Sequence, residues 1–267
     1  MDNIIKTKLE SFTRQSNFLE SENYLFYRFL SRRRLVLFIF KQNYFELLRL
    51  NDFHDTQTYN DRFWNREAIK YRWKVQKSII QKMSNYLSSL SVVVEFSRKE
   101  LMPVIKTDAA SVNKEIQIKD AFLNANPEHK FIVELRNAIS HHSPLLIASE
   151  YDSNNERNQP NIIIYKNDLL KYSKWSPESL EYLNSLPDKI YPIPIFKRHF
   201  ENFLNLQSSM LILMLSVDLN KIYSYRNQFA EILTDSEQSG LNILPFNQGY
   251  IKYLDTIITS AKKCLNI

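Results

Sequence analysis

The stretch Asn126–Pro144, NPEHKFIVELRNAISHHSP, carries the clearest structural signals in the chain. Asn126 can cap a helix, and Pro127 suits a first helical position because the N–H that it lacks would have no partner there. Glu128 would lie favourably at the positive end of the helix dipole, and Pro144 stops the helix. The stretch therefore predicts one helix.

The two sides of this helix differ in polarity. At about 100° per residue, an apolar stripe forms on one side. Its members are Phe131, Leu135, Ala138 and His142, with Ile132 and Ile139 on the flank. We expect this side to face a core, and His142 to be a buried, hydrogen-bonded core histidine. The opposite side is a polar arc of roughly 160° on the same helical wheel. It carries Glu134, Arg136, Asn137, Ser140 and His141.

Three residues of the polar arc are placed to act together. Asn137 and His141 are neighbours at i, i+4, and the long Arg136 side chain can bend toward them. A solvated outer face is the simplest interpretation of such residues, and a chemical site is the alternative.

An arginine, a polar residue, three further residues and a histidine, at the end of an amphipathic helix in a helical chain, resemble the signature motif of the HEPN family of ribonucleases. Arg136, Asn137 and His141 carry the resemblance. It covers about residues 55–235, with the N-terminal segment outside it. The family's motif closes a core helix of an all-helical bundle, so the resemblance implies an all-α, HEPN-like bundle.

The resemblance implies metal-independent RNA cleavage, in which a ribose 2′-hydroxyl attacks the adjacent phosphate and leaves a 2′,3′-cyclic phosphate. His141 would be the acid/base, because histidine titrates near neutrality. Arg136 would clamp the phosphate, and Asn137 would orient one of the two by a hydrogen bond. Glu134 and Ser140 are weaker candidates on the same face.

The resemblance also implies partners. RNA would be the substrate, and a toxin or phage-defence role would bring an antitoxin or another defence-system protein. The reaction needs two proton transfers, whereas each chain offers one exposed catalytic histidine, so we expect a homodimer with a composite active site. No tyrosine follows His141 closely, so the subfamily in which a partner nucleotidyltransferase modifies such a tyrosine is not supported. The alternative is a non-catalytic helical module that binds RNA, a nucleotide or a partner protein.

Composition excludes several classes of enzyme. The 267 residues, 44% of them hydrophobic, can bury a substantial core, but only Gly240 and Gly249 are glycines. A Walker loop and a dinucleotide fingerprint are therefore absent. The five histidines and the single Cys264 form no zinc pattern, so we expect neither metal nor cofactor. The lone cysteine favours the cytoplasm, and no apolar run approaches the ~20 residues that span a membrane.

Basic residues gather in two places in this chain of net charge +6. Arg32, Arg33 and Arg34 are consecutive, and they are either a solvated helix face or a phosphate-contacting patch. The second group follows one face of a long helix expected from about residue 61 to residue 101, whose apolar stripe includes Val75, Ile79, Met83, Leu87 and Leu90. We predict that it contacts the RNA backbone through Arg62, Arg66, Lys70, Lys74 and Lys77, although an exposed helix face carries charges in any case.

The predicted organisation is an N-terminal helical extension of two helices (1–52), a HEPN-like bundle (53–235) and a C-terminal helix (236–267). A β-hairpin insertion at 145–166 would hold all the strand in the chain. Ser176 and Pro177 predict the cap and the first position of a short helix through Leu186. Pro192 and Pro194 predict an extended segment before a second long helix from Phe196 to about Leu233.

Overall fold

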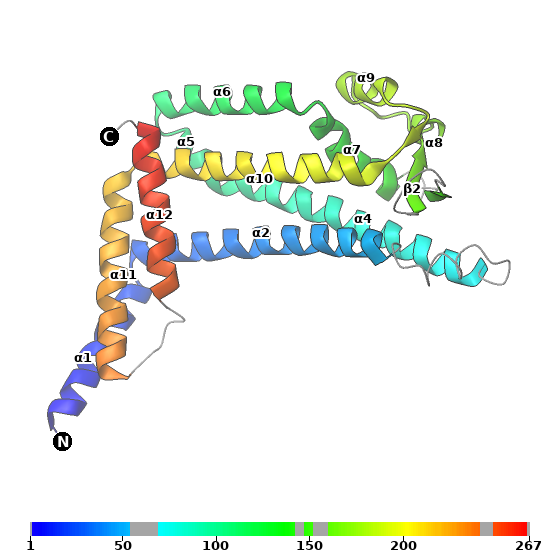
Figure 1. The fold of residues 1–267 in the computed structure, drawn as a ribbon. Helices are drawn as coiled ribbons and strands as arrows, with labels where there is room; N and C mark the ends of the chain where they lie inside the picture. The colour runs from blue at the N-terminus through cyan, green and yellow to red at the C-terminus, as the bar shows by residue number, and fades with distance from the viewer. Residues whose placement is uncertain (1, 54–68, 142–146, 152–159, 241–247, 266–267) are drawn as a thin grey trace. The chain divides into compact units, whose positions relative to one another are not determined.

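The computed structural model describes residues 2–53, 69–141, 147–151, 160–240 and 248–265, and most of them are helical (Figure 1). The helices are α1 Asp2–Leu19, α2 Glu22–Phe53, α4 Ile69–Phe96, the π-helix η2 Ser97–Leu101, α5 Met102–Ile105, α6 Ala109–Ala125, α7 Glu128–His141, α8 Lys166–Leu170, α9 Pro177–Ser185, α10 Pro192–Ser216, α11 Leu219–Ser239 and α12 Gln248–Leu265. Strands β1 Ile147–Tyr151, β2 Pro160–Tyr165 and β3 Lys189–Ile190 form a small sheet. An all-α fold with a small β-hairpin insertion is confirmed.

The chain folds into two compact units. Unit 1 contains residues 1–35, 97–118 and 207–267, and unit 2 contains residues 36–96 and 119–206. These units are defined by packing contacts, and their boundaries differ from those predicted near residues 52 and 235. The predicted domain boundaries stay predictions.

Unit 2 is built around an aromatic core. Phe40 of α2, Tyr86 of α4 and Phe200 of α10 are buried, and Tyr44 stacks on Phe200 with ring centroids 3.7 Å apart. The predicted apolar stripe of α4 supplies the other side of this core, through Val75, Ile79, Met83, Leu87 and Leu90. Repetition at steps of three and four thus produces the expected helix packing.

The sheet extends beyond the predicted hairpin. β1 pairs with β2 antiparallel, with Ile147 opposite Ile164, and β2 pairs on its other edge with β3. Strand is therefore not confined to residues 145–166, because β3 lies at Lys189–Ile190. The extended segment predicted before the second long helix is also shorter than expected, since α10 already begins at Pro192. A proline in the first turn of a helix lacks a donor that would have no partner there, so both prolines are tolerated.

The predicted helix from Phe196 to Leu233 is two helices. α10 ends at Ser216 and α11 begins at Leu219, with a 94° bend between them. Asp218 makes the break, because its side chain accepts a hydrogen bond from the Lys221 backbone N–H at 3.0 Å and so caps α11. The apolar periodicity continues across the break, which explains why a single helix was expected.

Unit 1 is centred on α11, which packs against α1 and α12. Figure 1 shows α11 and α12 side by side. Between them, Tyr225 donates to the hydroxyl of Tyr250 at 3.2 Å, and Phe229 packs on the Tyr250 ring at 4.9 Å. α11 ends at Gly240, whose φ of 64° is a left-handed conformation that glycine adopts without strain. The predicted N-terminal extension contains α1 and most of α2, and the predicted C-terminal segment contains the end of α11 and the whole of α12.

Candidate active site

Helix α7 presents a buried side and a polar side, as predicted. The buried side consists of Phe131, Ile132, Leu135 and Ala138, and it packs against α4 and α9 within unit 2. The predicted stripe residue His142 lies outside the described residues. Burial of this stripe fixes the rotation of the helix, so the opposite side is turned away from the core.

Two of the three predicted catalytic residues can be described on the polar side. The Arg136 side chain is exposed, and its Nη1 donates to Oδ1 of the half-buried Asn137 in a long hydrogen bond of 3.5 Å. His141 is the last residue of α7, and its side chain lies outside the described part of the structure. The structure therefore brings Arg136 and Asn137 together and places the backbone of residue 141 one turn beyond Asn137.

The two weaker candidates have different outcomes. Glu134 is half-buried, and its Oε2 accepts a 2.9 Å hydrogen bond from the backbone N–H of Ser176. Ser176 is the N-cap of α9, with Pro177 at the first helical position, as the sequence predicted. Glu134 thus attaches α9 to α7 and has a structural role. The side chain of Ser140 lies outside the described residues.

Of the predicted row of basic residues from Arg62 to Lys77, the structure describes only the side chains of the last two. Lys74 and Lys77 are exposed. Arg62 and Arg66 lie outside the described residues, as does the side chain of Lys70. Lys82, further along the same helix, forms an ion pair with Glu46 of α2. A lysine held in such a pair is less available to a phosphate than an exposed one.

The structure shows a polar cluster at the other end of α7 that sequence reasoning missed. His129 Nδ1 lies 2.9 Å from His199 Nε2, and His199 Nδ1 lies 3.0 Å from the hydroxyl of Tyr86. Since Tyr86 and His199 are fully buried, this is a chain of three hydrogen-bonding groups inside unit 2. We call Tyr86, His129 and His199 the histidine chain.

Burial keeps the histidine chain neutral. Desolvation lowers the pKa of His129 to about 4, against a smaller opposing effect of the Glu128 carboxylate. Desolvation, with a contribution from His129, lowers the pKa of His199 to about 3. Burial raises the pKa of the Tyr86 hydroxyl well above its ordinary value. At neutral pH the hydroxyl can donate to His199, which in turn donates to His129.

A buried carboxylate lies beside the histidine chain. Glu128 is fully buried, and its Oε1 accepts a 2.8 Å hydrogen bond from Nε of Arg198, whose side chain is 57% exposed. Glu128 Oε2 has no hydrogen-bond partner among the described residues. The sequence predicted Glu128 only as a charge at a helix start. In the structure it is a core group that Arg198 covers from the solvent side.

Asn126 also differs from its prediction. Its amide Nδ2 donates to the Phe122 carbonyl at 2.7 Å, and its Oδ1 accepts from Nδ2 of Asn202. The Asn126 backbone carbonyl accepts from the His129 N–H at 3.0 Å. The side chain therefore connects α6, α7 and α10, and Pro127 precedes the first residue of α7.

A sequence signal for the histidine chain exists on α10. His199 lies in the apolar stripe that contains Phe196, Phe200 and Phe203, so its burial follows from its position. Within the described part of the chain, no group of three or more His, Cys, Asp or Glu side chains could hold a metal ion.

The three consecutive arginines have different environments: Arg32 and Arg34 are exposed, and Arg33 is buried. Arg32 pairs with Glu100 at 3.2 Å. Arg33 is buried, and its Nη2 donates to the Gln207 carbonyl at 2.9 Å. Arg34 lies over the rings of Tyr250 and Tyr253, 5.6 Å from each centroid. Successive helical residues point about 100° apart, which separates the three side chains.

No family model, curated protein or solved structure matches the chain. Within the described residues, no single helix combines the length and apolarity needed to cross a membrane, and α10 and α11 meet those criteria only as a pair bent by 94°.

Proposed function

We propose that the chain is a metal-independent endoribonuclease whose reacting groups lie on the polar side of α7. One observation carries the proposal: the exposed guanidinium of Arg136, bonded to Asn137, on a helix that is buried on its other side and ends at His141. A packed helix holds such groups in fixed relative positions, and an exposed guanidinium is available to a phosphate.

The proposed chemistry assigns one task to each residue. The ribose 2′-oxygen bonds to the adjacent phosphorus, the bond to the 5′-oxygen breaks, and a 2′,3′-cyclic phosphate remains. One proton leaves the 2′-hydroxyl and one reaches the 5′-oxygen, and His141 carries a proton in one of these steps. Arg136 binds the non-bridging oxygens, whose charge grows in the transition state, and Asn137 restrains the guanidinium.

Two proton transfers favour a homodimer. One histidine of the motif serves as base and the same histidine of a second chain serves as acid. A self-complementary helix face at a two-fold axis would bring the two copies together in a composite site.

The RNA backbone would follow α4. Lys74 and Lys77 are exposed on this helix, which packs against α7. Arg62, Arg66 and Lys70 would extend the same track. Such contacts bind phosphates without reading sequence, so target choice would depend on other residues.

The physiological role that we propose is that of a toxin or phage-defence effector in the cytoplasm, controlled by an antitoxin or a defence-system partner. The support for this role is the resemblance of the Arg136–His141 motif to HEPN ribonucleases.

The decisive experiment incubates the purified chain with total RNA in EDTA and analyses the product ends. We expect cleavage that leaves 2′,3′-cyclic phosphate. Arg136→Ala should lower the rate on the order of 10²- to 10³-fold through lost charge stabilisation. The matched control is Lys130→Ala, which removes a cation of the same helix that pairs with Glu178 on the surface. RNA that stays intact but binds measurably would identify the non-catalytic module instead.

A heterodimer tests the composite site. One chain is wild type, and the other carries both Arg136→Ala and His141→Ala. Independent sites would leave about half of the activity, whereas a composite site would leave activity near that of the double-mutant homodimer. Full activity of a protein that stays monomeric at micromolar concentration would overturn the dimer.

A further inference from the structure

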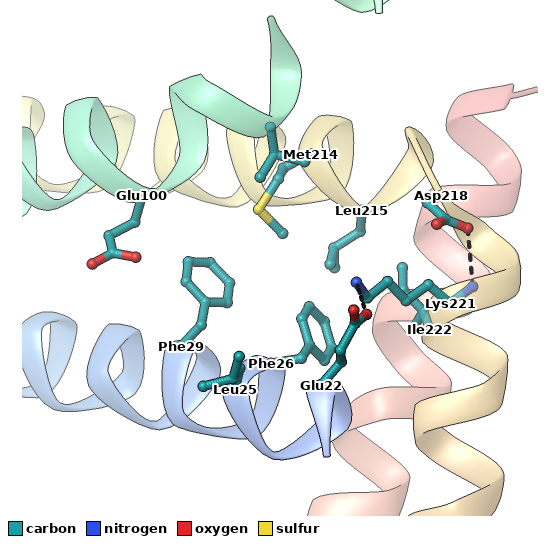
Figure 2. A pocket seen from close by; sticks show the side chains of 11 residues that line it. Glu22, Leu25, Phe26, Phe29, Glu100, Met214, Leu215, Asp218, Lys221 and Ile222 are labelled. Atoms are coloured by element: carbon teal, nitrogen blue, oxygen red, sulfur yellow. Dashed lines mark hydrogen bonds and ion pairs between the residues drawn. The ribbon is translucent and has the colours of Figure 1, made fainter. Parts of the chain in front are cut away.

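A cavity of about 440 Å³ opens within unit 1. Its walls come from the start of α2, from η2 and α5, from the end of α10 and from the start of α11. Figure 2 shows the side chains of these segments pointing into a common space. The volume is within the range of ligand sites, roughly 300–1,000 Å³.

The middle of the cavity is apolar. Phe26 and Phe29 lie on the α2 side with ring centroids 6.1 Å apart and an interplanar angle of 25°. The buried side chains of Met214, Leu215 and Ile222 form the opposite wall, beside the bend between α10 and α11. Displacement of water from such a surface by an apolar ligand is favourable, because apolar area is removed from water.

The two ends of the cavity are charged. Figure 2 shows Glu22, Asp218 and Lys221 together at one end and Glu100 at the other. Lys221 Nζ pairs with Glu22 at 2.9 Å, and the Glu100 carboxylate pairs with Arg32 at 3.2 Å. Asp218 accepts from the Lys221 backbone at 3.0 Å.

Carboxylates outnumber cations around the cavity. Three carboxylates and one ammonium line it, and the nearby Arg32 adds one further positive charge, so the local balance is −1 in a chain of net charge +6. An anionic ligand would meet Glu22 and Asp218 at one end and Glu100 at the other. A cation would be attracted by the same groups and by the faces of Phe26 and Phe29.

A second observation concerns the backbone. Glu100 belongs to η2, a five-residue π-helix between α4 and α5. π-helical turns are rare and are frequently found at functional sites. Here the π-helix contains Glu100, whose carboxylate lines the cavity, and the next residue, Leu101, is buried.

We propose that this cavity binds an amphiphilic organic cation. The apolar body of the ligand lies against Phe26, Phe29 and Met214, and its ammonium group lies at the end that carries Glu22 and Asp218. Glu22 is well suited to this contact because its side chain is 80% exposed and can turn from Lys221 to the ligand.

The test titrates the full-length chain by calorimetry with three probes of equal alkyl chain length: decyltrimethylammonium, decanol and decanoate. The two ionic probes are kept below their micellar concentrations, and decanol is kept below its solubility limit. We expect the cation to bind roughly tenfold more tightly than decanoate, a difference of about 1.4 kcal/mol. Equal affinity for all three probes would overturn the cationic class, and no binding of the cation would overturn the site.

Variants locate the site. Leu25→Trp places a larger side chain on a residue that lines the cavity and is 62% exposed, so the core is left intact. It should weaken binding of the cation at least severalfold. The matched control is Leu9→Trp, at a leucine of α1 that is 64% exposed and does not line this cavity. Equal effects of the two variants would place the ligand elsewhere.

Two further variants should act in opposite directions. Glu22→Gln should weaken cation binding roughly two- to fivefold, as expected for an exposed charge pair. Lys221→Met removes the competing ammonium and should strengthen it. Two variants that both weaken binding would contradict the assignment of the ammonium to this end.

Discussion

The two ends of α7 are opposites, although each carries a histidine. At the N-terminal end, His129 contacts His199 in a buried chain of hydrogen bonds, and Glu128 is fully buried. At the C-terminal end, Arg136 is exposed and bonded only weakly to Asn137. One helix thus holds a desolvated polar core at one end and an exposed guanidinium at the other.

The difference matters because burial decides what a histidine can do. A buried histidine with a pKa of about 4 or 3 is neutral at pH 7 and exchanges few protons with a substrate. An acid/base catalyst needs a pKa near the working pH and access to the reacting group. We therefore assign a structural role to the histidine chain and propose a catalytic role for His141.

The largest effect is expected at the exposed end. His141→Ala should lower the rate of RNA cleavage on the order of 10²- to 10⁴-fold and leave the melting temperature nearly unchanged. The helical periodicity of the sequence places residue 141 on the polar arc, where a truncation creates no core cavity. Rates come from single-turnover assays, and His129→Ala at the buried end is the counterpart that should lower stability. A cleavage rate within threefold of wild type would remove His141 from the mechanism.

At the buried end the expected effect is on stability. His199→Ala opens a cavity beside Phe203 and leaves Tyr86 and His129 without their shared partner. We expect a loss of about 2–4 kcal/mol in the free energy of unfolding, measured by urea denaturation. Any change in cleavage should follow the folded fraction. Wild-type stability with lost activity would reverse the roles that we assign to the two ends.

The histidine chain should also make the fold sensitive to acid. The folded pKa values, about 4 for His129 and about 3 for His199, lie below the unfolded value of about 6.5. The unfolded chain therefore binds more protons than the folded chain below pH 6.5. Protonation of these histidines does not lower the free energy of unfolding above pH 6.5, and it lowers it progressively as the pH falls below this value. Near pH 5 the loss is about 2 kcal/mol per histidine.

Urea titrations between pH 7.5 and 5 measure this slope. The control is the double variant His129→Leu with His199→Phe, which keeps apolar volume in place and should flatten the slope above pH 5, where few carboxylates titrate. A wild-type slope as flat as that of the double variant would mean that the histidines are protonated in the folded chain.

The sequence predicts the helices well because their signals are local. The stripe of α4, the Ser176 cap with Pro177 and the buried side of α7 each follow from neighbours in the chain. β3 pairs only two residues, and no local pattern of that length predicts a strand. The break at Asp218 was missed because the apolar periodicity continues through it.

The polar clusters were missed for another reason. His129 and His199 are 70 positions apart, and their contact depends on how α7 packs against α10. The burial of His199 could have been predicted from the stripe of Phe196, Phe200 and Phe203, but its partner could not. Likewise, Arg33 is buried among residues distant in sequence, which a run of three arginines does not indicate.

The smallest effect is expected on α4, which packs against α7. Lys74→Gln with Lys77→Gln should change the free energy of unfolding by no more than about 0.5 kcal/mol, because both side chains are exposed. If each lysine contacts a phosphate, the double variant should weaken RNA binding equally for unrelated sequences. The slope of log affinity against log salt should then decrease by about one unit per lost contact.

The control for this pair is Lys171→Gln with Lys221→Gln, which removes two lysines whose ammonium groups are held by Asp168 and Glu22. Both pairs of substitutions lower the net charge equally, so a long-range effect of charge would change both salt slopes alike. A change confined to the α4 pair would locate the RNA backbone there. Equal slopes for wild type and the α4 pair would mean that Lys74 and Lys77 only solvate their helix. Other basic residues would then contact the RNA backbone. The proposed catalytic role of the polar side of α7 would be unaffected, because the Arg136 and His141 variants test it separately.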